Sequence, residues 1–244
     1  MVKINDCHHM KDAGKRMNRA NTAWATARRV SAFILLTSCL CLTGCLVAAS
    51  ALHYKIVGPP PVPARYVPAQ EPMLVLVENY RASGGASSEA EMLARNLVEE
   101  LKTHKVVPLV PLDNLYALRT EKGVAYRKMS MAAVGRETGA KQVLYVDVQQ
   151  SSIGAPPGSD LLKGRVAVQV RIVDVETGTT RWPTEDTEGV PMAYETPLPR
   201  ADVTTTEPMV RQYMHEQMAI RIGRLFYKWK PKDTSETLDM GEAR

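Results

Sequence analysis

The body of this 244-residue chain lacks net charge. The whole sequence contains 31 Lys and Arg residues and 26 Asp and Glu residues. Residues 1–44 hold seven of the basic and two of the acidic residues, so the part from Cys45 onward has 24 of each. A body without net charge gives no argument for binding a phosphate backbone, and we therefore expect no nucleic-acid partner. An apolar share of 45% excludes wholesale disorder.

Cysteine is scarce in the same part of the chain. Cys7, Cys39 and Cys41 all precede Cys45, which is the only cysteine from that position onward. A single cysteine cannot form an internal disulfide bond, and a free thiol is a liability in an oxidising compartment. Chemical modification of Cys45 would remove that liability.

Histidine is equally scarce and offers no catalytic pattern. Only His53, His104 and His215 follow Cys45, and no metal-ligand spacing links them. His215 and Glu216 begin like the helix motif of zinc proteases, but Ala219 occupies the place of the second histidine. We therefore expect His215 and Glu216 to face solvent on a helix. The sequence predicts no metal, no cofactor, no catalytic residue and no small-molecule substrate, and so a protein that is not an enzyme.

A leader precedes Cys45. Arg28 and Arg29 are followed by an uncharged stretch, residues 30–52, and this order is typical of a secretory signal peptide. The sequence Leu42-Thr43-Gly44-Cys45 resembles the lipobox of bacterial lipoproteins, in which the thiol is diacylated and the signal peptidase then cuts before the cysteine. Residues 1–44 are the expected signal peptide, and Cys45 is the expected lipidation site, carrying palmitate-like chains that hold the protein to a membrane.

Two other interpretations of the leader stay open. Cleavage after Ala49 would release a secreted protein, and residues 30–52 are long enough to remain as a membrane-spanning anchor. All three interpretations place the body outside the cytosol, because the basic residues before the uncharged stretch, Arg28 and Arg29, stay on the cytosolic side of the membrane. Leu46, in place of an aspartate, favours the outer membrane and a periplasm-facing domain. Translation that starts at Met17 would leave 28 residues before Cys45, which is a normal length for a signal peptide. We therefore expect that residues 1–16 are an artefact of the choice of start codon.

The exported part divides into a spacer, a domain and a tail. Residues 45–72 include a proline-rich run at 58–68 that cannot form a helix, which favours an extended tether. Residues 73–230 contain the hydrophobic patterns of a globular domain, and residues 231–244 form a polar tail. The tether would lift the domain off the membrane.

The domain alternates strand and helix patterns. Apolar or alternating runs predict strands at 73–78, 106–110, 143–148, 165–174 and 179–182, the last two joined by a turn at 176–178. Periodic apolar residues predict helices at 88–105 with a capping box of Ser88 and Glu91, at 113–121, at 130–139 with a stop at Gly139, and at 208–230. Residues 183–207 lack a regular period and are expected to form a surface loop.

These elements predict an α/β or α+β fold with one mixed sheet of about five strands and three to four helices. In residues 137–148, and in residues 170–178 leading to Trp182, the chain resembles the TolB amino-terminal and curli-secretion-lipoprotein group. That group shares an anticodon-binding-like fold, and the resemblance covers roughly residues 73–229. The matched residues correspond to the end of a helix before a buried strand and to a glycine turn in a hairpin. Such features specify a fold and do not indicate a catalytic or binding function.

The resemblance implies an envelope protein that works through protein contacts in envelope assembly or secretion. One alternative is a small-ligand-binding or hydrolytic domain that uses the loop at Gly84 and Gly85 and the 183–207 loop as pocket walls. A second alternative is a subunit of an oligomeric secretion channel, although the long amphipathic hairpins of pore-forming relatives have no counterpart in this sequence. The acidic residues of the 183–207 loop, Glu185, Asp186 and Glu188, follow no calcium-loop order and are expected to be solvated.

Overall fold

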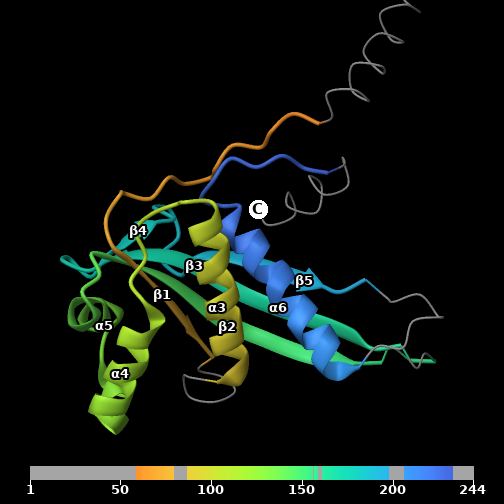
Figure 1. Ribbon diagram of the computed structural model, residues 1–244, viewed down its shortest axis with the longest axis horizontal. Coiled ribbons are helices and arrows are strands. Elements are labelled where there is room, and N and C mark those ends of the chain that lie inside the picture. Colours follow the sequence, from red (N-terminus) through yellow and green to blue (C-terminus); the bar gives the residue numbers. More distant parts are fainter. Residues whose placement is uncertain (1–58, 80–86, 156, 159–160, 198–205, 233–244) are drawn as a thin grey trace, which may run out of the picture. The chain divides into compact units, whose positions relative to one another are not determined.

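A mixed sheet with helices on both faces forms the core of the computed structural model, which describes residues 59–79, 87–155, 157–158, 161–197 and 206–232 (Figure 1). All six residues of strand β1 (Met73–Glu78) are buried, as its apolar sequence predicts. β1 pairs in parallel with β2 (Gln142–Gly154), from Met73 opposite Gln142 to Glu78 opposite Asp147. Residues 73–78 therefore form the predicted first strand.

The other strand pairs are antiparallel. β2 pairs with β3 (Lys163–Asp174) along nearly its whole length, with a bulge between Val148 and Gln150. β3 also pairs with β4 (Thr180–Trp182) near its end and with β5 (Val190–Glu195) near its start. The strand order is β1-β2-β3-β4, with β5 beside β3.

Two helical layers cover the sheet. Helices α3 (Ser88–Thr103) and α6 (Glu207–Gly223) lie side by side over one face and enclose the larger core (Figure 1). On the other face, α4 (Leu112–Lys122), the 3-10 helix η1 (Gly123–Lys128) and α5 (Met131–Thr138) enclose a smaller core. The described residues thus have the predicted α+β fold, with five strands and four α-helices. None of their helices combines the length and the apolar character needed to span a bilayer.

The helix ends are close to those that the sequence predicts. The cap of α3 is Ser87 and not Ser88, because the Ser87 Oγ accepts a hydrogen bond from the Ala90 amide at 3.1 Å. Ser130 caps α5, and Gly139 ends it in the left-handed region at a φ of 84°, both as predicted. The one-residue error at α3 has a simple source, since two consecutive serines offer the same side chain.

The predicted strand at 106–110 is wrong. Only one bridge forms there, between Met73 and Leu109, supported by the Met73 amide donating to the Pro108 carbonyl and the Val110 amide donating to the Met73 carbonyl, both at 2.9 Å. Pro108 and Pro111 have no amide hydrogen, so a longer ladder along the edge of β1 cannot form.

The loop expected at 183–207 contains strand β5, and the sequence prediction is wrong for that segment. Met192 and Tyr194 of β5 are buried and alternate with exposed residues, which is the pattern of a strand with one packed face. The chain enters β5 through Gly189 at a φ of 115°, where a Cβ atom would lie 2.9 Å from the Val170 carbonyl oxygen. A conformation and approach of this kind require glycine.

The last helix is shorter than predicted and the spacer is in part packed. α6 ends at Gly223 instead of Lys230, and residues 225–229 then lie beside residues 62–66. We call these two segments the terminal strap. The Val62 amide donates to the Trp229 carbonyl at 2.8 Å, and the Trp229 amide donates to the Val62 carbonyl at 3.1 Å. Tyr66 stacks on Trp182 at 5.7 Å between ring centroids, so residues 62–66 of the expected tether are packed against the domain.

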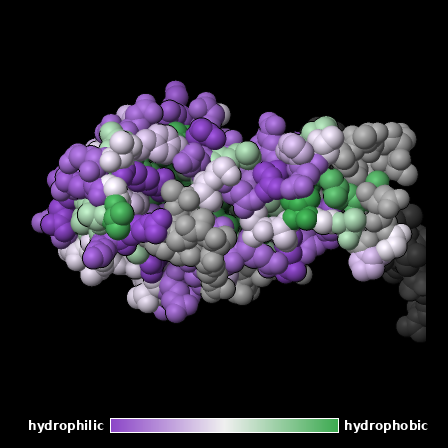
Figure 2. Space-filling view, turned by 90° about the horizontal axis from the view of Figure 1, so that it is seen from below, coloured by the Kyte–Doolittle hydropathy of each residue, from purple (hydrophilic) through white to green (hydrophobic). Residues whose placement is uncertain are grey.

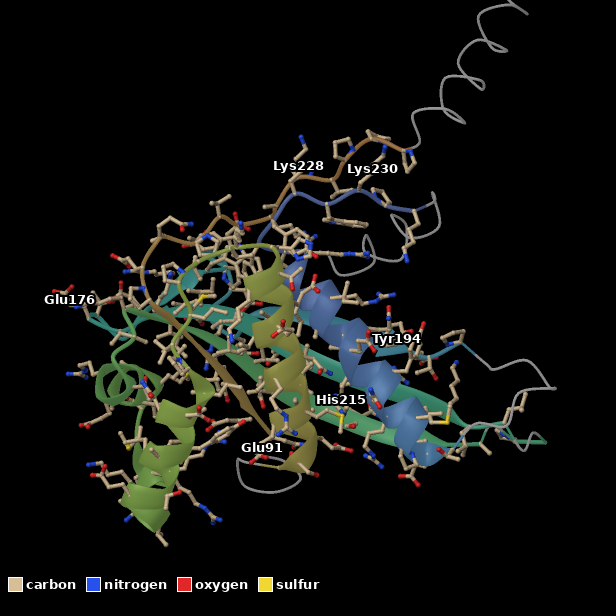
Figure 3. The ribbon with its side chains drawn as sticks, viewed as in Figure 1. Glu91, Glu176, Tyr194, His215, Lys228 and Lys230 are labelled. Atoms are coloured by element: carbon tan, nitrogen blue, oxygen red, sulfur yellow. The ribbon has the colours of Figure 1, made fainter. Side chains whose placement is uncertain are left out.

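His215 is fully buried on α6, and the expectation that it faces solvent is wrong (Figure 3). Its position on the helix coincides with the stripe formed by Met214, Met218 and Ile222, which packs against α3 and the sheet. Neither ring nitrogen has a hydrogen-bond partner among the described residues. Burial lowers the pKa of the imidazole from its ordinary value of 6.5, and the nearby Arg211 adds to this, whereas Glu89 on α3 opposes it.

We predict that His215 makes the stability of the fold depend on pH. Because the folded-state pKa lies below the unfolded-state value, the unfolded chain takes up this proton first as the pH falls below about 6.5. Stability is full above that pH and then declines, by up to about 1.4 kcal/mol per pH unit, until the folded-state pKa is reached. Urea unfolding between about pH 7.5 and about pH 5 should show this decline in the wild type, and His215→Leu should remove it. Equal pH profiles in the two proteins would contradict the prediction.

Candidate functional site

One half of the sheet's second face is polar and solvent-exposed. The α4–η1–α5 layer covers β1 and the start of β2, where Val143 and Tyr145 are buried. Farther along β2, and on β3 and β5, the side chains on this face are half-buried or exposed, alternating with the buried residues of the opposite face. We call this area the open face; its residues are Asp147, Gln149, Gln150, Ser152, Arg165, Ala167, Gln169, Arg171, Pro191, Ala193 and Glu195.

The centre of the open face is flat and its border is charged. Ala167 of β3 lies opposite Ala193 of β5, so no long side chain rises at the centre. Glu195 forms ion pairs with Lys163 at 2.5 Å and with Arg165 at 3.4 Å. Lys163, and to a smaller extent Arg165, lower the pKa of the Glu195 carboxyl. These exposed pairs order the border of the face but contribute little to stability.

Polar groups also dominate elsewhere on the surface. Figure 2 shows a side of the molecule where hydrophilic residues predominate and hydrophobic ones form small groups. The most exposed large apolar side chains among the described residues are Val124 and Val67, which lie on different elements. A surface of this kind is suited to polar contacts and not to an extensive apolar interface.

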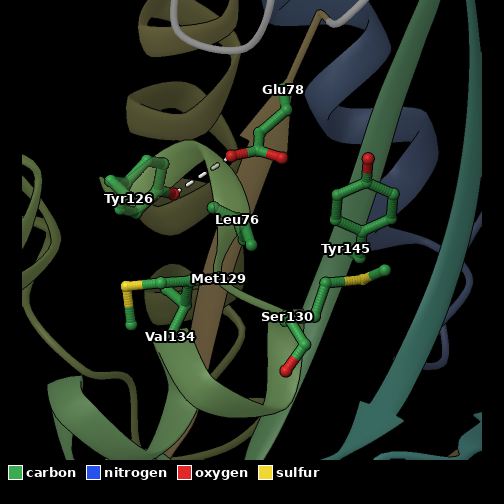
Figure 4. A pocket seen from close by; sticks show the side chains of 8 residues that line it. Leu76, Glu78, Tyr126, Met129, Ser130, Val134 and Tyr145 are labelled. Atoms are coloured by element: carbon green, nitrogen blue, oxygen red, sulfur yellow. Dashed lines mark hydrogen bonds between the residues drawn. The ribbon is translucent and has the colours of Figure 1, made fainter. Parts of the chain in front are cut away.

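A small pocket adjoins the open face. It has a volume of about 140 Å³ and lies between β1, β2, η1 and α5 (Figure 4). Glu78 and Tyr126 line it, together with Leu76, Met129, Ser130, Met131, Val134 and Tyr145. Glu78 is the last residue of β1 and stands opposite Asp147 of β2, so two carboxylate residues occupy neighbouring positions on this face. The pocket therefore lies at the border between the covered and the open parts of the sheet.

The buried carboxylate of Glu78 is held by two side chains. The Tyr126 hydroxyl donates a hydrogen bond to Glu78 Oε1 at 3.0 Å, and Arg119 Nη2 lies 3.8 Å from the same oxygen. The Arg119 guanidinium also lies over the Tyr126 ring, 5.3 Å from its centroid. Burial and then the negative charge of Glu78 raise the pKa of Tyr126 to about 12. The phenol thus stays protonated and available as a donor to Glu78 at any physiological pH.

Neither of the described histidines, His104 and His215, lines this pocket. Cys45, His53, Gly84 and Gly85 lie outside the described residues. His104 stacks on Tyr227 at 3.7 Å between ring centroids, at the opposite end of α3 from the loop that precedes it.

The acidic residues before β5 do not form a site with their neighbours. Glu185, Asp186 and Glu188 are exposed, as predicted, and none of them lines the pocket. Within the described residues, no group of three His, Cys, Asp or Glu side chains is arranged to hold a metal ion. No sequence pattern points to the Glu78 site, because Glu78 and Tyr126 are 48 residues apart and follow no motif.

The hydrogen bond from Tyr126 should stabilise the fold measurably. We expect Tyr126→Phe to lower the free energy of unfolding by about 1–3 kcal/mol, because it removes a donor from a buried carboxylate. Tyr116→Phe is the matched control, since the Tyr116 hydroxyl is buried without a partner among the described residues and its removal should cost nothing. Urea unfolding compares the two Tyr→Phe variants, and adding Glu78→Gln alone and Glu78→Gln combined with Tyr126→Phe measures the coupling of the two residues. Equal effects of the two Tyr→Phe changes would contradict this assignment.

Comparisons with known proteins give only distant structural likeness. No protein-family model matches the chain, and no curated protein matches it. The solved structures that it resembles include a lipoprotein, GNA1162, from Neisseria meningitidis, at 14% identity and a TM-score of 0.39, covering 52% of this chain and 81% of that one. A PelC dodecamer from Paraburkholderia phytofirmans has 14% identity and a TM-score of 0.35, with 67% and 90% covered. A minor lipoprotein from Acinetobacter baumannii has 12% identity and a TM-score of 0.35, with 64% and 91% covered. At these TM-scores the likeness assigns neither a family nor a function to this chain.

Proposed function

We propose that this chain is a non-enzymatic, lipid-anchored envelope protein that binds another envelope protein through its open face. The anchor is the thiol of Cys45, acylated after export and placed in the outer membrane, with the domain facing the periplasm. The observation that carries the proposal is the combination of a lipobox with a domain whose sheet leaves half of one face open to solvent.

The distance along the chain fits an anchored domain. Sixteen residues lie between Cys45 and Val62, where the terminal strap begins. A fully extended segment of that length spans at most about 60 Å. Such a linker lets the domain reach partners at a range of heights above the membrane while remaining attached.

The open face has the properties of a protein-binding surface. Its side chains stand on three hydrogen-bonded strands, so the backbone beneath them is fixed before binding and loses little conformational entropy. The small residues Ala167 and Ala193 allow a partner's backbone to approach closely. Arg165, Gln150 and Glu195 supply donors and acceptors around them. The fitting partner is a folded protein with a flat, polar surface of mixed charge.

Affinity isolation from membranes tests this function. We expect the wild-type protein to recover a stoichiometric envelope protein, and Ala193→Arg to lose it, because a long charged side chain at the centre of a flat face prevents close contact. Ala117→Arg is the matched control, since Ala117 is exposed on α4, away from β5. The control should recover the same partner at wild-type yield.

Two results would contradict the proposal. Equal recovery with Ala193→Arg and Ala117→Arg would show that the open face is not the binding surface. Recovery of the chain alone, as a large detergent-stable homo-oligomer on sizing, would favour the channel-subunit alternative. Unfolding curves of both variants are needed in parallel, because a surface change of this type should alter stability by no more than about 0.5 kcal/mol.

A further inference from the structure

The two chain segments that form and flank the terminal strap carry charges of one sign. Residues 59–70 and 224–232 contain five basic residues and no acidic residue; the basic ones are Arg65, Arg224, Lys228, Lys230 and Lys232. We call these five the basic strip. This concentration is notable because the chain from Cys45 onward has no net charge.

The backbone of the strap sets the direction of the lysines. Trp229 and Pro231 are buried, while Lys228, Lys230 and Lys232 are exposed. Successive side chains of an extended segment point to opposite sides, so the three lysines share the outer side. Figure 3 shows Lys228 pointing away from the helices.

The strap is rigidly attached to the domain. The two hydrogen bonds between Val62 and Trp229 hold its two segments together, and the Arg224 guanidinium lies over the Trp229 ring at 4.0 Å from its centroid. The Arg65 and Tyr66 amides both donate to the Leu225 carbonyl, at 2.8 Å and 3.0 Å. The lysines are therefore presented by a fixed support.

The end of α3 extends this positive region. His104 stacks on Tyr227 of the strap, which brings the exposed Lys102 and Lys105 to the same end of the domain. Glu100 is an acidic residue at this end, and its carboxylate accepts a hydrogen bond from the Tyr227 hydroxyl and lies 3.4 Å from His104 Nδ1. Its carboxylate is thus engaged by Tyr227 and His104.

We propose that the basic strip docks on an anionic phospholipid bilayer. Lysine and arginine side chains near a bilayer are attracted to anionic headgroups, and a basic patch combined with acyl chains gives a stable attachment that neither gives alone. Arg65 lies in the described segment that is nearest to Cys45 along the chain, and residues 225–229 are hydrogen-bonded to that segment, so the strip lies beside the described part of the domain that is closest in sequence to the anchor. Val67, which follows Arg65 and Tyr66 and is 73% exposed, adds an apolar side chain that can contact the membrane interface. The location in the cell rests on the proposed lipid anchor, whereas the affinity for anionic lipid does not.

Vesicle sedimentation tests the docking without the anchor. The protein is the chain from residue 45 with Cys45→Ala, which carries no lipid and retains the whole compact unit Pro60–Arg244. We expect it to bind vesicles of phosphatidylcholine with one third phosphatidylglycerol, to release them as salt is raised, and to ignore pure phosphatidylcholine. K228E/K230E should lower the affinity roughly twentyfold or more, from the loss of two lysines at the surface.

A variant with the same change of charge elsewhere is the control. R127E/K128E alters two exposed residues of η1, and it should bind as the wild type does. K228Q/K230Q, which removes the charges without reversing them, keeps the test valid if the double glutamate variant fails to fold.

Three results would overturn the proposal. One is equal loss of binding in K228E/K230E and R127E/K128E, which would mean that only net charge matters. Another is equal binding to neutral and anionic vesicles. The third is binding that appears only after deletion of residues 233–244, a segment with four acidic residues and one basic residue, because that segment would then be the occupant of the strip. None of these results bears on the partner recovery through the open face.

Discussion

The unequal burial of neighbouring strands is the constraint on which the rest of the structure depends. β1 has no polar side chain before Glu78, so both of its faces must be covered, and helices are needed on both sides of the sheet. β3 alternates apolar and polar residues and needs cover on one side only. The α3 and α6 layer serves both strands, whereas the smaller α4–η1–α5 layer serves β1 and the start of β2. The open face is the part of the sheet's second face that the α4–η1–α5 layer does not cover.

The distribution of charge, not its sum, gives the domain its distinct surfaces. The part of the chain from Cys45 onward, which has no net charge, places a buried carboxylate at Glu78, a mixed polar face on β3 and β5, and a basic strip beside the terminal strap. Each has a different physical consequence. Glu78 is held by Tyr126 and Arg119 within the fold, while the open face and the strip are exposed to other molecules. One side of the domain would then serve a protein partner and another the bilayer that carries it.

Local patterns predicted most of the fold because the forces that decide those elements are local. The stripe of Leu93, Leu97 and Leu101, the stop at Gly139 and the turn before β4 all rest on spacing within a few residues. Tertiary contacts decided the rest. Proline removed the strand expected at 106–110, and pairing with β3 created β5 from a segment with only weak periodicity. His215 was misplaced because its burial depends on α3, and the Glu78 site was missed because its members meet only in the folded chain.

The account's central claim is that a lipid on Cys45 holds this domain at a membrane. Mass spectrometry of the amino-terminal peptide from protein recovered from membranes tests it most directly. The account predicts a peptide that begins at Cys45 and carries a diacylglyceryl group on the sulfur, with nothing remaining of residues 1–44. A peptide with an unmodified Cys45 thiol, or one that still includes residues from before Cys45, would contradict it.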